Sequence, residues 1–183
     1  AQKRGRIKRQ NNHNKVFSCE NVTTQGINAL SMLEFSNCCL QNQRRDKSEM
    51  IGILVLTHED LGDHMIRCAS HVVGMKPPQL LHLSVFPQDD PDAVLAKARA
   101  MIKQLDGGDG VLVLSDMCGA TPCNIASRLM QPGKVECIAG VNLPMLVRVL
   151  TYRSEPLPVV IEKGLSGGQC GVMHIGAEPC HAD

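Results

Sequence analysis

The sequence predicts an α/β protein: a three-layer sandwich in which helices cover both faces of a mainly parallel sheet. From residue 50 onward, short apolar runs alternate with longer segments of helical period. These runs are also continuous and rich in β-branched residues, as in "MIGILVLT" at 50–57. Strands of that kind are buried on both faces, which is typical of parallel sheets joined by right-handed helical crossovers.

The strands are expected where these apolar runs stop at polar or turn-forming residues. The run at 50–57 leads directly into His58, and the run at 110–116 ends in Ser115 and Asp116. The predicted strands are 50–57, 79–86, 110–116 and 134–141, followed by a short last strand at 170–175, "CGVMHI".

Helices are expected between these strands. At 60–74 apolar side chains recur at helical spacing, and Gly74 supplies the stop. At 89–108 acidic residues and a proline mark the start, and glycine marks the end. The helix at 121–130 is expected to open with a threonine cap and a proline in the first helical position. Two further helices are expected at 142–152 and 156–168.

The chain divides into two parts of opposite charge. Residues 1–49 hold nine Lys and Arg against four Asp and Glu, together with twelve Asn and Gln, and show no sustained period. We expect 1–49 to be a basic, disordered extension and 50–183 to be the folded domain. The run "KRGRIKR" is short and lacks interleaved aromatic residues, so no nucleic-acid partner is expected.

Composition narrows the class of protein further. No stretch reaches the roughly 18 apolar residues of a membrane span, and the basic start lacks the features of a signal peptide. The nine cysteines form no C-x-x-C pair, a usage that suits a reducing compartment. A cytoplasmic protein without membrane insertion is the expectation.

Two strand ends carry candidate chemistry. Ligands of open parallel sheets bind outside the carboxyl ends of the strands, and His58 and Asp116 stand at two such ends. If the two strands are neighbours, the Asp116 carboxylate can accept a proton from one ring nitrogen and leave the other as a nucleophile. If they are not, His58 is a solvated loop residue and Asp116 a turn residue.

The segment "MCGATPCN" follows Asp116 directly. Gly119 and Ala120 are small enough to let backbone approach a ligand, and Thr121 opens a helix whose free N–H groups favour an anion. This cradle is neither a Walker loop nor a G-x-G-x-x-G turn, and alone it indicates only a turn before a helix. Beside a nucleophilic histidine with a carboxylate partner, it predicts phosphate binding by Gly119, Ala120 and Thr121, and hence a phosphorylated histidine.

Other chemistry is not expected. His64, Cys68 and His71 share one helical side but lack a fourth ligand, so no metal site is predicted. Cys118 lies near the proposed anion site and could be a thiolate nucleophile. The phosphatase pattern Cys-x5-Arg is missing, however, because Asn124 occupies the position of the arginine. Neither a metal nor a nucleotide is required, and no cofactor is predicted.

Three blocks carry a family resemblance: "LVLTH", "VLVLSDMCGATPCNIAS" and "IAGVNLPMLVRVL". Together they resemble the mannose-type IIA component of the bacterial sugar phosphotransferase system, over residues 50 to about 175. The resemblance implies strand order 2-1-3-4 and a C-terminal strand, 170–175, exchanged within a homodimer. It also implies that His58 accepts phosphate from the phosphocarrier HPr and passes it to a IIB component, with Asp116 orienting the histidine. Thr121 and its neighbouring amides then border the phosphoryl group.

Two positions depart from the family pattern. Glu59 stands where the family usually has glycine after the histidine, and Ala120 replaces the second glycine of the cradle. The resemblance further implies association with a membrane complex through IIC and IID components. A different class of function also stays open, in which a regulatory protein has its His58 phosphorylation state read by a partner.

Overall fold

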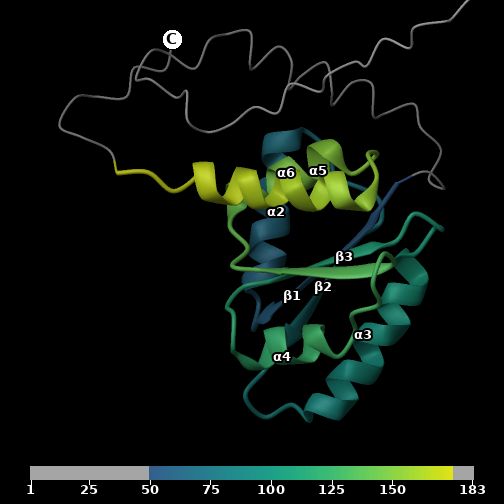
Figure 1. Cartoon of the computed structure of the whole chain (residues 1–183). Coiled ribbons are helices and arrows are strands. Elements are labelled where there is room, and N and C mark those ends of the chain that lie inside the picture. The colour runs from purple at the N-terminus through teal and green to yellow at the C-terminus, as the bar shows by residue number, and fades with distance from the viewer. Residues whose placement is uncertain (1–49, 175–183) are drawn as a thin grey trace, which may run out of the picture.

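The computed structural model describes residues 50–174 and shows a four-stranded sheet between two layers of helices (Figure 1). The strands are β1 (Gly52–His58), β2 (Leu80–Val85), β3 (Val111–Ser115) and β4 (Val135–Ala139). Their order is β2-β1-β3-β4 and every pairing is parallel. The three-layer α/β class and the order 2-1-3-4 are therefore confirmed, while the extension expected at 1–49 lies outside the described residues.

Each face of the sheet has its own apolar cluster. In β1, Ile53 and Val55 join the cluster under one helical layer, whereas Leu54 and Leu56 join the cluster under the other. This alternation is the ordinary two-residue period of a strand, here with both faces covered. The first layer contains α2 (Leu61–Val73), α5 (Leu143–Tyr152) and α6 (Leu157–Cys170), and the second contains α3 (Pro91–Leu105) and α4 (Thr121–Ser127).

The helix ends follow local chemistry with one correction. Asp90 caps α3 by accepting from the Asp92 N–H at 3.1 Å, and α2 stops at Gly74, whose φ is 78°. The expectation that Thr121 caps α4 is wrong. Ala120 holds the extended cap conformation and its carbonyl accepts from Asn124 N–H at 2.9 Å, so the helix begins one residue earlier than expected and Thr121 is its first residue.

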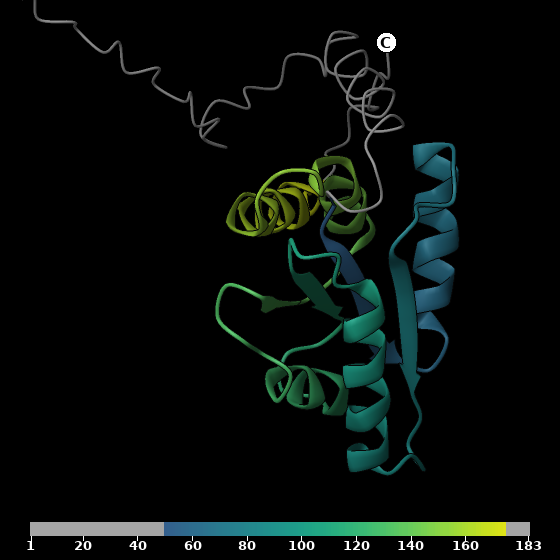
Figure 2. The same ribbon diagram turned by 90° about the vertical axis from the view of Figure 1, so that its right-hand side faces the viewer.

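The end of the chain differs from expectation at Cys170. This residue ends α6, so it does not start a strand, and residues 171–174 form no strand within the chain; Ile175 lies outside the described residues. Gly168, where the last helix was expected to end, lies within α6 and faces α5, because a Cβ at Gly168 would lie 2.6 Å from Met145 Cε. Figures 1 and 2 show α5 and α6 side by side. The strand exchange between two protomers stays a prediction.

Candidate functional site

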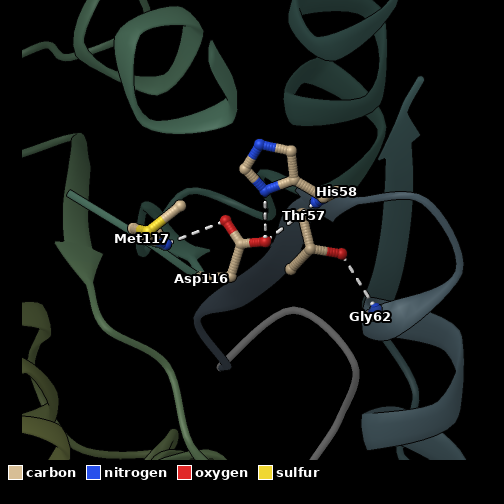
Figure 3. A network of polar contacts seen from close by, with 5 residues as sticks. All are labelled: Thr57, His58, Gly62, Asp116 and Met117. Carbon is tan, nitrogen blue, oxygen red and sulfur yellow. Dashed lines mark hydrogen bonds and ion pairs between the residues drawn. The ribbon is translucent and has the colours of Figure 1, made fainter. Parts of the chain in front are cut away.

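His58 and Asp116 meet at the carboxyl edge of the sheet (Figure 3). His58 is the last residue of β1, and Asp116 directly follows the last residue of β3. The two strands are neighbours, with Leu56 opposite Ser115, so the next residues along each strand come within reach. The two strands are therefore adjacent, as the predicted contact between these residues requires. His58 Nδ1 lies 2.7 Å from Asp116 Oδ2.

The Asp116 carboxylate is held on both of its oxygens. The backbone N–H of His58 donates to Oδ2 at 2.9 Å, and the N–H of Met117 donates to Oδ1 at 2.8 Å. Burial by itself raises the pKa of this carboxyl. Hydrogen bonds from the backbone and ring of His58, the charge of that ring and the Met117 N–H outweigh burial, so the pKa of Asp116 lies below its usual value. Asp116 is therefore ionised at neutral pH.

The ring of His58 is partly exposed, whereas its carboxylate partner is nearly buried. The His58 side chain is 43% exposed and that of Asp116 only 11%. In Figure 3 the ring nitrogen that is not bonded to Asp116 points away from the carboxylate. When Nδ1 carries the proton and donates it to Asp116, Nε2 keeps a free lone pair. The arrangement suits nucleophilic attack by Nε2 on an electrophile brought from outside.

The backbone after His58 turns sharply into α2. Glu59 has a φ of 44°, in the left-handed region that favours glycine, and its N–H donates to Val85 O at 3.1 Å. Thr57 Oγ1 accepts from the Gly62 N–H at 2.9 Å. Thr57 ends the apolar run at 50–57, and that run alone did not predict this contact. A threonine shortly before a helix start was the available signal, since such residues commonly cap helices.

The expected phosphate cradle lies between β3 and α4. Gly119 has a φ of 83°, Ala120 precedes the first turn of α4, and Thr121 begins it. Within the described part of the chain, the side chain of Thr121 makes no hydrogen bond to His58 or Asp116. This segment directly follows Asp116 in the chain. The phosphate-binding roles of Gly119, Ala120 and Thr121 stay predictions.

The alternative chemistries find no support in the described range. No group of three or more His, Cys, Asp or Glu among residues 50–174 could hold a metal ion. His64 Nδ1 instead bonds to Asp60 O at 2.8 Å. The Cys118 thiol is free and exposed, whereas burial, followed by the charges of nearby cysteines, raises the pKa of Cys137 to about 12. None of the helices in the described part is long and apolar enough to cross a membrane.

The fold and site define an open parallel α/β domain that presents a histidine, oriented by a carboxylate, at the point where strand order reverses. Comparison with known families gives the particular assignment. The family model EIIA-man, described as "PTS system fructose IIA component", matches residues 52–157. The chain belongs to this family of IIA components of the sugar phosphotransferase system, and a phosphocarrier role in that system is the function that membership supports.

Curated relatives agree with this assignment. The mannose-specific EIIAB component of Escherichia coli K12 is 30% identical over 132 residues, which cover 70% of this chain and 41% of the relative. The fructose-specific EIIA component of Bacillus subtilis is 27% identical over 107 residues, covering 58% of this chain and 73% of the relative. The chain thus spans less than half the length of the EIIAB relatives it matches.

Solved structures show the same fold. The mannose/sorbose-specific IIA subunit from Enterococcus faecalis superposes with a TM-score of 0.63 at 23% identity, covering 72% of this chain and 99% of that one. Component EIIA from Streptococcus agalactiae gives a TM-score of 0.62 at 21% identity, covering 68% and 97%. At these identities the likeness establishes the architecture alone.

Proposed function

We propose that His58 is the phosphoryl-accepting residue of this phosphocarrier, taking the group from phospho-HPr and passing it to a IIB component. The observation that carries the proposal is the 2.7 Å contact between His58 Nδ1 and Asp116 Oδ2, with the other ring nitrogen directed away from the carboxylate. A carrier must accept from one protein and donate to another. A ring that is 43% exposed at a sheet edge is open to both in turn.

The transfer needs no group outside the two proteins. The Nε2 lone pair of His58 attacks phosphorus in line while the bond from phosphorus to the donor's histidine nitrogen breaks, and the donor ring keeps that electron pair. The proton on His58 Nδ1 stays in its bond to Asp116. The carboxylate then balances the positive charge that grows on the ring as the new P–N bond forms. Donation to the IIB component runs the same step in reverse.

The segment after Asp116 is proposed to border the phosphoryl group. Gly119 and Ala120 keep side chains away from the approaching oxygens, and the amides and hydroxyl around Thr121 supply donors. Pro122 stands in the first turn of α4 and carries no N–H, so Thr121 contributes the first available backbone donor of the helix. The matched family blocks include this segment.

The partners follow from the family and stay proposals here. HPr and a IIB component are the expected donor and acceptor, and association through IIC and IID components belongs to the same expectation. A homodimer that exchanges the segment following α6 is proposed as well. Light scattering that gives the mass of a single chain at micromolar concentration would refute the dimer.

A regulatory role is the second candidate, in which a partner reads the phosphorylation state of His58. The feature that motivates it is Glu59, whose carboxylate directly follows the phosphorylated residue and would oppose the repeated, rapid phosphoryl exchange that a carrier needs. The two roles differ in one measurable step. A carrier passes its phosphate rapidly to a IIB component of the mannose type, whereas a regulator holds it.

The test begins with phosphoenolpyruvate, enzyme I, HPr and this protein. Intact mass spectrometry is expected to show one added phosphate per chain, stable in base and lost in acid, as a phosphoramidate behaves. Omitting HPr is the control and should give no addition. A protein that stays unphosphorylated with an HPr preparation that phosphorylates another IIA component refutes the proposal.

A further inference from the structure

Thr57 directly precedes His58 in β1, and its side chain lies on the face of the sheet that α2, α5 and α6 cover. It is 1% exposed, and it continues the side of β1 that carries Ile53 and Val55, the side covered by α2. Its hydroxyl oxygen accepts from the backbone N–H of Gly62 at 2.9 Å (Figure 3). The strand that delivers His58 is therefore tied, one residue earlier, to the first turn of the next helix.

This bond replaces a missing helix cap. Asp60 occupies the cap position of α2 but makes no cap bond with its side chain. The first N–H groups of a helix have no partner within it and need one from elsewhere. Gly62 is buried in the first turn of α2, where water does not supply that partner, and Thr57 Oγ1 does so from the end of β1.

The contact depends on a close approach that only glycine allows. A Cβ placed at Gly62 would lie 2.9 Å from Thr57 Oγ1 and 3.1 Å from Val55 Cγ1. Real Cβ atoms do not come that near without a shift of their neighbours, and here the neighbours are buried in β1. Gly62 and Thr57 thus form a matched pair that sets how close α2 begins to the strand.

Only Glu59 and Asp60 separate the histidine from α2. Glu59 completes the turn in a left-handed conformation, φ 44°, that a non-glycine residue adopts only when its surroundings hold it there. Its N–H is fixed by Val85 O, and the His58 N–H is fixed by Asp116 Oδ2. The Thr57–Gly62 bond is the third tether, and it anchors the far side of the same turn.

We propose that Thr57 is a positioning residue for phosphoryl transfer: its bond to Gly62 holds the β1–α2 turn so that the His58 ring keeps its Nδ1–H directed at Asp116. The inference rests on His58 being the acceptor. Thr57 touches neither the phosphate nor the ring, and acts through the backbone that carries the ring. Loss of the bond widens the range of ring positions and mixes the two neutral tautomers, which removes the nucleophilic nitrogen from part of the population.

The test compares Thr57→Val with Thr57→Ser and with a control, Thr151→Val. Valine keeps the shape of threonine and removes the acceptor, and serine restores it. Thr151 is also buried, and its hydroxyl donates to Val147 O; both residues lie in α5, away from the β1–α2 turn. For phosphorylation by phospho-HPr, Thr57→Val is expected to lower kcat about tenfold or more with KM nearly unchanged. Thr57→Ser and Thr151→Val are expected to keep kcat within about twofold of the parent protein.

A second measurement needs no phosphate donor. Ring ¹⁵N shifts of His58, recorded where the ring is neutral, are expected to report the Nδ1–H tautomer in the parent protein and in Thr57→Ser, and a mixture in Thr57→Val. Gly62→Ala is expected to resemble Thr57→Val, because it disturbs the same contact from the other side. Circular dichroism checks that each variant is folded.

Two results would overturn the inference: a folded Thr57→Val protein with parental kcat and parental ring shifts, or a serine variant that fails to restore them. A parent protein that accepts no phosphate refutes the proposed function instead. In that case the ring shifts still decide whether Thr57 positions His58.

Discussion

The two segments that frame the site are built in opposite ways. The turn after β1, residues 59–60, is short and tied by the Thr57–Gly62, Glu59–Val85 and His58–Asp116 bonds. The segment after β3, residues 116–120, is more open: Met117 is 58% exposed, Cys118 is exposed, and the turn hydrogen bond from Ala120 N–H to Met117 O is long at 3.4 Å.

The same contrast appears in the left-handed residues of the two segments. Glu59 holds φ 44° with a side chain that raises the energy of that conformation, whereas Gly119 holds φ 83° with no atom within 4 Å of where a Cβ would stand. The first segment is therefore held firmly by its hydrogen bonds on both sides of His58. The second is held by the short bond from Met117 N–H to Asp116 Oδ1 and by two long bonds of 3.4 Å, from Ala120 N–H to Met117 O and from Asn124 Nδ2 to Gly119 O, so we expect it to adjust more readily to a ligand.

Substitution of His58 is expected to have the largest effect on phosphoryl transfer. His58→Ala removes the side chain proposed to accept the phosphoryl group, so uptake of phosphate measured by intact mass is expected to vanish. The exposed ring leaves few contacts behind, and the free energy of unfolding is expected to change by no more than about 0.5 kcal/mol. His64→Ala serves as the control and should be phosphorylated at the parental rate. Full uptake by a folded His58→Ala protein would place the acceptor elsewhere.

Asp116→Asn is expected to have the next largest effect on phosphoryl acceptance. The substitution weakens the link between the turn after β1 and the segment after β3, which Asp116 makes through His58. The amide is neutral and can present its NH2 to the ring, which favours the wrong tautomer and leaves the charge on the phosphorylated ring unbalanced. We expect acceptance to slow by about two orders of magnitude or more, by analogy with the orienting carboxylate of hydrolase triads. Asp89→Asn is the matched control, since Asp89 accepts a backbone N–H from Phe86 at 2.8 Å. An unchanged rate in rapid-quench assays stopped with base, in which the phosphohistidine is stable, would reduce Asp116 to a structural role.

Gly119→Ala probes the adaptable segment. A side chain at φ 83° destabilises the fold by about 1 kcal/mol through backbone strain, although the space around it is empty. Gly133→Ala is a close control, because Gly133 has φ 76° and equally empty surroundings. Urea unfolding is expected to show a similar loss for both variants, and only Gly119→Ala should slow phosphoryl acceptance. Equal rates in the two variants would remove Gly119 from the cradle.

Substitutions of Glu59 are expected to have the smallest effects. Glycine relieves the left-handed strain but also frees the unfolded chain, so a net gain of about 0.5–1 kcal/mol in the free energy of unfolding is expected. Glu59→Gln keeps the strain and removes the charge, and should leave stability unchanged while lengthening the lifetime of the phosphohistidine. A phosphohistidine lifetime that is the same in the parent and Glu59→Gln would show that the carboxylate points away from the bound group.

Periodicity and residue type determined much of this protein without a structure. The continuous apolar runs gave parallel strands, the capping and stop residues gave α2 and α3, and the polar strand ends singled out His58 and Asp116. These features depend on neighbours within a few residues, so they can be predicted from short windows of sequence. The strand order came from the family resemblance rather than from any pattern in the chain.

Tertiary structure decided which of these local features meet. His58 and Asp116 are 58 residues apart, and they touch only because β3 lies beside β1 in the sheet. The last helix was expected to end at Gly168, but α6 continues to Cys170, and Gly168 packs against Met145 of α5. Thr57 had no visible role until α2 was placed against β1 with Gly62 at the contact. In each case the structure is decided by a contact between separate helices or strands. Local propensity does not include the free energy of such contacts.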